Sequence, residues 1–333
     1  MELELQQELP KKGYTVAAEL LVSLPSSDRF LEDLSLILKE CVSSESNLPD
    51  DIHILYTQLV RVTTSQEEYK SILIRDLEII LFEIMEPTND PAVIYIDEQE
   101  EEEVCSLYQK ALVDNADAQL ELAHFYRSIE RDEWAFDWFK VAADTGSADA
   151  LYWLGNAYFV GKVVEHDLER AYFYYKEAAE KGHGDALNNY ADMYLRGEYV
   201  EKDEKIALEL FKAGADKGVP EAMYTLGYMY ENGVGTEVDM GESKRWFTES
   251  ALFGDVFAAN RLGHEAVEEG LGDEAISWYQ MAADRGDSYG EFNLGLCYEN
   301  GIGTQVNMKK AKYWYQKAAL KGDDHAKQRL KEF

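Results

Sequence analysis

Cysteine is scarce in this 333-residue chain, and its three cysteines, Cys41, Cys105 and Cys297, stand far apart. Because no C-x-x-C pair occurs, the sequence offers neither a disulfide framework nor a zinc site, which is typical of a reducing compartment. The most apolar stretch, IILFEIM at 79–85, is too short to span a bilayer. The first residues, MELELQQELPKKGY, lack the basic and apolar segments of a signal peptide. These absences predict a soluble cytoplasmic protein without a membrane segment or a metal.

Positive charge is the second shortage. The chain has 32 lysine and arginine residues against 65 aspartate and glutamate residues, a formal net charge of −33. Such a field repels nucleic acids and anionic membranes and favours a basic protein partner. The alternative is that the acidic surface only keeps a long chain soluble.

Catalytic motifs are also missing. None of the six histidines stands in an H-x-x-x-H spacing, and there is no G-x-S-x-G sequence or Cys–His pairing that would indicate a nucleophile. Two loops, ENGVGTEVDM at 231–240 and ENGIGTQVNM at 299–308, carry G-x-G-T. They lack the lysine of a phosphate-binding loop and the third glycine of a dinucleotide fingerprint, and they are acidic. We therefore predict no catalytic residue and no cofactor.

A repeat with a period near 36 residues occupies the C-terminal two thirds. The glycines that close successive units are Gly146, Gly182, Gly218, Gly254, Gly286 and Gly322, with spacings of 36, 36, 36, 32 and 36. Three residues before each glycine stands Ala, and seven before stands Phe or Tyr. These spacings place the residues on one face of a helix, which the glycine can end in the left-handed conformation.

A second helical pattern precedes the first in each unit. It reads small-x-x-x-large-small-x-x-Tyr, as in Ala150, Leu154, Gly155 and Tyr158, except that the fifth copy has Ala266 in place of Tyr. The inner Gly or Ala permits a tight helix crossing. In the second, third, fourth and sixth units a glycine follows this helix, and an N-cap residue precedes the next one: Asp167, Asp203, Asp239 or Asn307. The loop of the first unit has no glycine, and the fifth unit is shorter by four residues. The unit is a helical hairpin that buries its apolar stripe only by stacking on neighbours.

The stretches DALYWLGNAYFVGKVVEHDLERAYFYYKEAAEKG (149–182) and YGEFNLGLCYENGIGTQVNMKKAKYWYQKAALKG (289–322) resemble the Sel-one-like repeat, a relative of the tetratricopeptide repeat. The resemblance covers 117–323. It implies an all-α fold, a right-handed α-α solenoid of about six helical-hairpin repeats. It also implies a scaffold or adaptor rather than an enzyme, and some members are immunity proteins of bacterial antagonism systems.

Outside the repeats, residues 1–103 hold 24 acidic and 7 basic residues and do not keep the period. Helical patterns occur there at 14–24, 27–43, 51–62 and 65–86. The predicted organisation is an acidic helical N-terminal domain (1–100), a linker and lead-in helix (101–116), the solenoid (117–323) and a C-terminal cap helix (324–333).

Candidate partner-binding residues follow from the stacking. A solenoid presents a concave face lined by its first helices, and two positions of each first helix lie off the packing stripe. In five of the first helices these positions hold Trp153, Asn156, Asn189, Asp192, Thr225, Tyr228, Arg261, His264, Asn293 and Leu296, of which all but Leu296 are the candidate partner-binding residues. Aromatic and polar side chains of this kind suit protein recognition. The alternative for Trp153 and Tyr228 is packing within the array.

The sequence therefore predicts a non-enzymatic scaffold that binds a protein partner through its concave face, and the charge argument favours a basic partner. A sharper version is an immunity or inhibitor protein that neutralises a basic toxin domain. The first alternative is a regulatory adaptor that joins two proteins, one on the N-terminal domain and one on the solenoid. The second, less favoured, is an enzyme with a site in the groove.

Overall fold

The computed structural model describes residues 107, 110–111, 115–128 and 132–333. The four helical patterns predicted before residue 87 lie outside the described residues, as does most of the lead-in helix, of which residues 107, 110 and 111 are described as helical. The chain divides into two compact units after Trp153. Every regular element in the described ranges is an α-helix, which confirms the all-α prediction for them.

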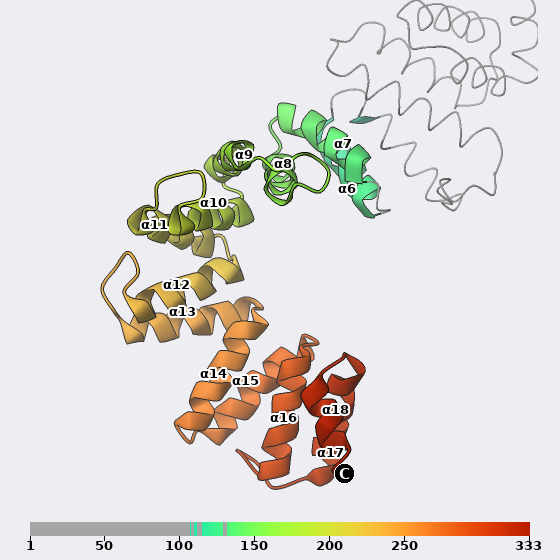
Figure 1. Ribbon diagram of the computed structural model, residues 1–333, viewed down its shortest axis with the longest axis vertical. Helices are drawn as coiled ribbons and strands as arrows, with labels where there is room; N and C mark the ends of the chain where they lie inside the picture. Colours follow the sequence, from blue (N-terminus) through green and yellow to red (C-terminus); the bar gives the residue numbers. More distant parts are fainter. Residues whose placement is uncertain (1–106, 108–109, 112–114, 129–131) are drawn as a thin grey trace, which may run out of the picture. The chain divides into compact units, whose positions relative to one another are not determined.

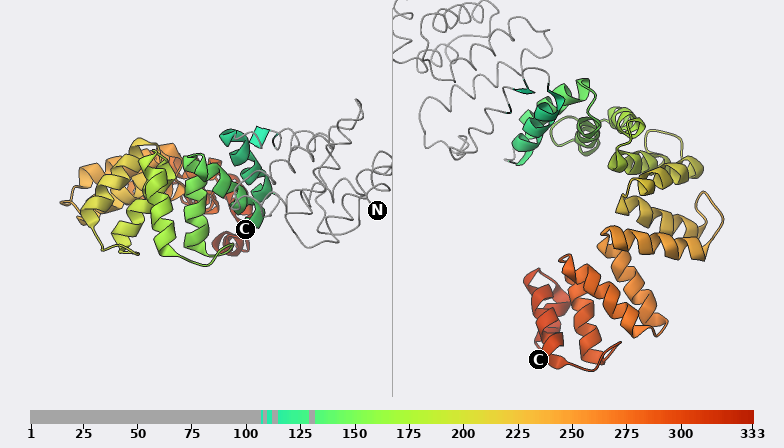
Figure 2. Two further views of the ribbon diagram at one scale, coloured as in Figure 1. Left: turned by 90° about the horizontal axis from the view of Figure 1, so that it is seen from above. Right: turned by 180° about the vertical axis from the view of Figure 1, so that it is seen from behind.

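Thirteen helices are described, and their bounds keep the predicted alternation of first and second helices. They are α6 (Ala116–Ser128), α7 (Asp132–Asp144), α8 (Ala148–Val160), α9 (Leu168–Glu180), α10 (Gly184–Arg196), α11 (Glu204–Asp216), α12 (Pro220–Asn232), α13 (Met240–Phe253), α14 (Val256–Glu268), α15 (Gly272–Asp284), α16 (Ser288–Asn300), α17 (Met308–Leu320) and α18 (Asp324–Leu330). Within the second unit, each helix from α9 to α18 packs against the next (Figures 1 and 2).

Close packing inside each hairpin depends on a small residue in the first helix. Gly263 of α14 lies under the ring of Tyr279 of α15, and a Cβ atom on Gly263 would stand 2.5 Å from Tyr279 Cε1. Gly155 and Tyr175 repeat this arrangement. A glycine inside a helix costs about 1 kcal/mol relative to alanine. The ring that packs against each backbone is therefore the physical reason for the small residue.

The predicted N-caps are confirmed. Asp167, Asp203, Asp239 and Asn307 cap α9, α11, α13 and α17, and each side chain accepts one or two hydrogen bonds from backbone N–H groups of the first turn. The closing glycines all have positive φ, as the left-handed ending requires. The shortened fifth repeat departs from this pattern, because Leu271 stands before α15 and makes no side-chain capping bond.

The two G-x-G-T loops have a structural role in the described unit. Gly233 and Gly301 end α12 and α16 in the left-handed conformation. The second glycine of each loop, Gly235 or Gly303, lies against backbone at the start of the preceding repeat's second helix. The N–H of Gly235 donates to Glu204 Oε2 at 3.3 Å. In the first of these loops a carboxylate of the chain therefore accepts the N–H of the second glycine.

Candidate functional site

Asn156 and Asn189 connect two neighbouring first helices. Asn189 Nδ2 donates to Asn156 Oδ1 across α8 and α10 at 3.3 Å, and Tyr175 Oη donates to the same oxygen at 2.8 Å. These predicted residues therefore lie on one surface, which we call the first-helix face: the exposed sides of α8 from Leu154 onward and of α10, α12, α14 and α16. Their amides hold the repeats together as well as facing outward.

Arg261 performs the same cross-linking role further along this face. Its Nη2 donates to Glu231 of α12, and its Nε donates to Glu265 of its own helix at 3.0 Å. The guanidinium carbon also lies 4.3 Å from the ring centroid of Phe247. Arg261 is therefore held by two carboxylates and an aromatic face, which leaves it little freedom to reach a partner.

His264 lies between two tyrosine hydroxyl groups. Its Nδ1 is 2.9 Å from Tyr279 Oη, and its Nε2 is 2.9 Å from Tyr289 Oη. Burial raises the pKa of Tyr279, with smaller contributions from Cys297 and Tyr289, so this hydroxyl stays protonated at neutral pH. The imidazole is consequently fixed in orientation, and it links the core of its own hairpin to α16 of the next repeat.

Four other predicted residues differ in how available their side chains are to a protein partner. Asp192 pairs with Arg196 at 2.7 Å, and Thr225 Oγ1 donates to the backbone oxygen of Glu221. Tyr228 is 49% exposed, so it is available to a partner. Asn293 is only 4% exposed, and its burial makes contact with a partner impossible without rearrangement. The sequence pattern did not predict the burial of Asn293, because it results from the packing of α16 against its neighbouring helices.

Trp153 belongs to the first unit, where three side chains pack against its indole. The Arg127 guanidinium carbon lies 3.7 Å from the ring centroid, and the Phe139 ring stacks at 5.9 Å with an interplanar angle of 17°. His124 approaches the indole edge-on at 6.1 Å. These contacts favour the alternative in which Trp153 packs within the array.

The neighbourhood of Trp153 makes stability depend on pH. Burial lowers the pKa of His124, the charge of Arg127 lowers it further, and Asp149 opposes both. In the unfolded chain a histidine has a pKa of about 6.5, which is higher than the lowered pKa of His124 in the folded chain. As the pH falls, the unfolded state therefore binds the proton first and is stabilised relative to the folded state. We expect the free energy of unfolding of the wild type, relative to His124→Asn, to fall between pH 7.5 and 5.5. Urea unfolding followed by circular dichroism measures it, and a difference independent of pH would contradict the assignment.

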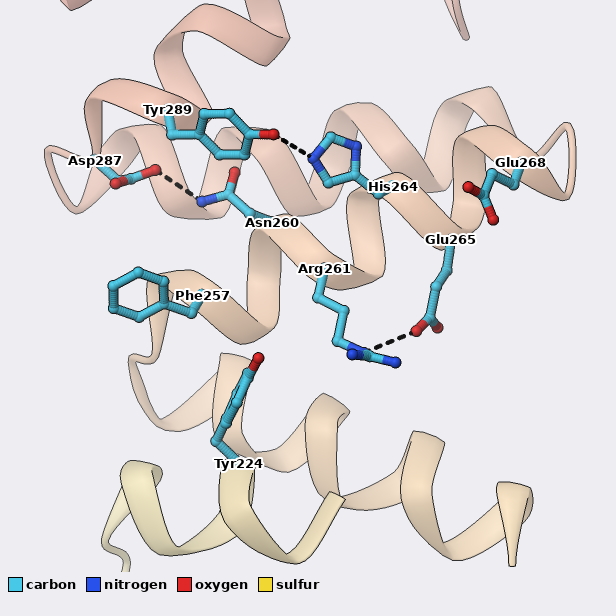
Figure 3. A pocket seen from close by; sticks show the side chains of 9 residues that line it. All are labelled: Tyr224, Phe257, Asn260, Arg261, His264, Glu265, Glu268, Asp287 and Tyr289. Carbon is cyan, nitrogen blue, oxygen red and sulfur yellow. Dashed lines mark hydrogen bonds and ion pairs between the residues drawn. The ribbon is translucent and has the colours of Figure 1, made fainter. Parts of the chain in front are cut away.

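A cleft of about 490 Å³ opens on the first-helix face between α12, α14 and the start of α16 (Figure 3). Two predicted residues, Arg261 and His264, line it. Its other lining residues were missed, above all the aromatic side chains Tyr224, Phe257 and Tyr289. Phe257 is 73% exposed.

A sequence signal for two of these rings does exist. Phe257 and Tyr289 stand immediately before the small residue that opens the pattern of their first helices, Ala258 and Gly290. The four preceding repeats carry an acidic residue at this position: Asp117, Asp149, Asp185 and Glu221. The change from a carboxylate to a ring in two adjacent repeats marks a local specialisation.

Three carboxylates face the cleft beside one guanidinium. Glu265 pairs with Arg261, whereas Glu268 has no hydrogen bond or ion pair with the described residues. Asp287 caps α16, and its Oδ2 accepts from Gly290 N at 2.6 Å and from Asn260 Nδ2 at 2.7 Å. The excess of acceptors over donors makes the cleft suitable for a cationic group.

Two further properties concern only the described part of the chain. It contains no group of three or more His, Cys, Asp or Glu side chains arranged to hold a metal ion. No helix in it combines the length and the apolar character needed to cross a bilayer.

The hairpins and their shared face define an α-α solenoid of helical repeats. The Sel1 repeat pattern matches residues 116–147, 148–183, 184–219, 220–254, 256–287 and 288–323, so the chain belongs to the Sel1 repeat family. These bounds agree with the predicted span of 117–323. Proteins of this family are in general interaction scaffolds rather than enzymes.

Solved structures support the same fold. A protective antigen present in uropathogenic Escherichia coli strains, which displays an SLR fold, is 31% identical over 68% of this chain, with a TM-score of 0.58. The match spans half of that protein's length. A Sel1 repeat protein from Oxalobacter formigenes is 28% identical over 63% of this chain and 88% of its own, with a TM-score of 0.57.

A curated relative matches over a short segment. The DAP3-binding cell death enhancer 1 of Rattus norvegicus is 46% identical over 54 residues, which are 16% of this chain and 11% of that protein. The chain thus matches only a small part of this relative's length.

Proposed function

We propose that this chain is an interaction scaffold that binds a basic protein partner through its first-helix face. The observation that carries the proposal is the cleft on α12, α14 and α16. It combines exposed aromatic rings with more carboxylates than cations. Aromatic anchors supply much of the energy of protein interfaces, and the net charge of −33 attracts a basic partner over a long range.

A pair of double variants tests this function. Tyr228→Ala with Phe257→Ala removes two exposed rings from first helices, and Phe253→Ala with Tyr313→Ala removes two exposed rings from second helices. Both pairs are exposed, so neither should alter folding. We expect affinity capture from the native host to yield a basic protein that the second variant retains and the first variant binds at least about tenfold more weakly. Equal binding by both variants would refute the proposed face.

Salt dependence and truncation separate the finer versions of the proposal. An immunity or inhibitor role requires a stoichiometric complex whose association rate falls steeply as ionic strength rises. An adaptor role requires two different partners, one retained by residues 1–103 and another by residues 104–333. The acidity of both parts supports an electrostatic contribution in either role.

A further inference from the structure

We propose that the cleft on α12, α14 and α16 is a pocket for an arginine side chain of the partner, an inference that rests on the proposed scaffold function. Phe257, Tyr289 and Tyr224 surround one end of the cleft, and Glu265 and Glu268 lie toward the other end (Figure 3). A planar cation can stack on an aromatic face and donate to carboxylates in its own plane, and guanidinium does both.

The second observation is an unpaired acceptor in the wall of this pocket. Asn260 is only 6% exposed, and both hydrogen bonds of its Nδ2 are made within the protein, to Val256 O and Asp287 Oδ2. Its Oδ1 is buried without a hydrogen-bond partner. A buried acceptor left unpaired is costly, so a donor brought by a ligand would restore the missing bond. Oδ1 points toward the ring of Tyr289 (Figure 3). To admit the donor, this half-exposed side chain must move aside and give up its hydrogen bond to His264 Nε2.

Further acceptors remain open for the same ligand. Both bonds to Asp287 reach its Oδ2, which leaves Oδ1 for another donor. Glu268 has no hydrogen bond or ion pair with the described residues. Arg261 uses its donors on Glu231 and Glu265 and lies over Phe247, so it does not fill the aromatic end.

The hydrogen-bond acceptors that line the cleft distinguish between guanidinium, ammonium and quaternary ammonium groups as possible ligands. A guanidinium has five N–H donors in a flat fork, and a lysine ammonium has three donors around a compact charge. A quaternary ammonium has none, and it would leave Asn260 Oδ1 unpaired. The cleft volume of about 490 Å³ leaves room for a long side chain. Arginine is therefore the occupant that satisfies both the rings and the acceptors.

The test measures three capped tripeptides, Gly-Arg-Gly, Gly-Lys-Gly and Gly-citrulline-Gly, against the full chain by NMR titration. The signals followed are the Asn260 side-chain amide and the Tyr289 ring. We expect arginine to bind about fivefold more tightly than lysine, because stacking and the fork geometry are lost. Citrulline has nearly the same shape without the charge and should show no saturable binding. Equal affinity for arginine and lysine, or saturable binding of citrulline, would overturn the proposal.

Matched variants locate the pocket. Phe257→Ala should weaken Gly-Arg-Gly binding about fivefold or more. Glu268→Gln, which removes a charge toward the other end of the cleft, should weaken it by a smaller factor of about two through the loss of longer-range attraction. The controls Phe253→Ala and Glu274→Gln remove an exposed ring and an exposed carboxylate from second helices and should leave binding unchanged. Equal effects of test and control variants would place the site elsewhere.

The titration contains no partner protein, so its failure can be told apart from failure of the proposed function. If Gly-Arg-Gly does not bind while the first-helix variant still loses the captured protein, the scaffold function holds and the arginine pocket is wrong. If Gly-Arg-Gly binds at Phe257 but no captured protein distinguishes the two double variants, the pocket holds and the proposed docking face is wrong.

Discussion

Gly303→Ala is expected to lower the free energy of unfolding by about 2–5 kcal/mol, through left-handed strain and overpacking together. Gly303 is the second glycine of the ENGIGT loop, and its φ is +60°. A Cβ atom there would overlap the backbone carbonyl of Gly272 at the start of α15. The Cβ position is fixed by the backbone of residue 303, and the atoms that it meets belong to the backbone of Gly272, so no side-chain rotation can relieve the overlap.

The matched control for this substitution is Gly270→Ala. Gly270 has a similar φ of +76°, but a Cβ atom on it would meet nothing within 4 Å. Its cost should therefore be the left-handed strain alone, about 1–2 kcal/mol. Urea unfolding followed by circular dichroism compares the two variants. Equal losses would show that contact between the loop and the preceding repeat contributes no stability.

The double substitution of Lys317 and Lys321 by Met is expected to cost about 3 kcal/mol, because it leaves a buried charge unpaired. Glu291 of α16 is 0% exposed, and its Oε1 lies 3.2 Å from Lys317 Nζ and 2.8 Å from Lys321 Nζ. Breaking a buried ion pair typically costs about 3–5 kcal/mol. We expect the lower value here, because both lysine side chains are partly exposed to water.

Adding Glu291→Met to this double variant should restore most of the lost stability. A buried ion pair can be replaced by apolar side chains of similar volume at little cost, whereas removal of one partner is costly. Thermal unfolding of the wild type, the double variant and the triple variant separates these contributions. A triple variant as unstable as the double would show that the lysines act through packing instead.

The arrangement of the helices could be predicted from the sequence because it depends on local rules. The capping side chains, the closing glycines and the small residues under aromatic rings each act within one hairpin. A period repeated six times makes such rules visible in a single chain. The positions of Asn156, Asn189, Arg261 and His264 on first helices follow from the same period.

The composition of the cleft could be predicted only in part. Arg261 and His264 line it as residues of the predicted face, but Phe257, Tyr289 and Tyr224 were not recognised. Phe257 and Tyr289 lie one position before the small residue of their helices, where the four preceding repeats carry an acidic residue. Asn293 shows the opposite error, since the pattern placed it on the face and the packing of α16 buries it.

The order of the helices and their ends are determined by the sequence itself, since contacts between residues close in the chain specify them. The repeat period in addition predicts that one hairpin stacks on the next. Which side chains are available to a partner was decided by the tertiary structure. Availability depends on contacts between helices: Arg261 is bound to Glu231, His264 is held by Tyr279 and Tyr289, and Phe257 is left uncovered. Those contacts join residues 15 to 30 positions apart in the sequence. The repeat period alone does not predict which side chains make such contacts and which stay exposed.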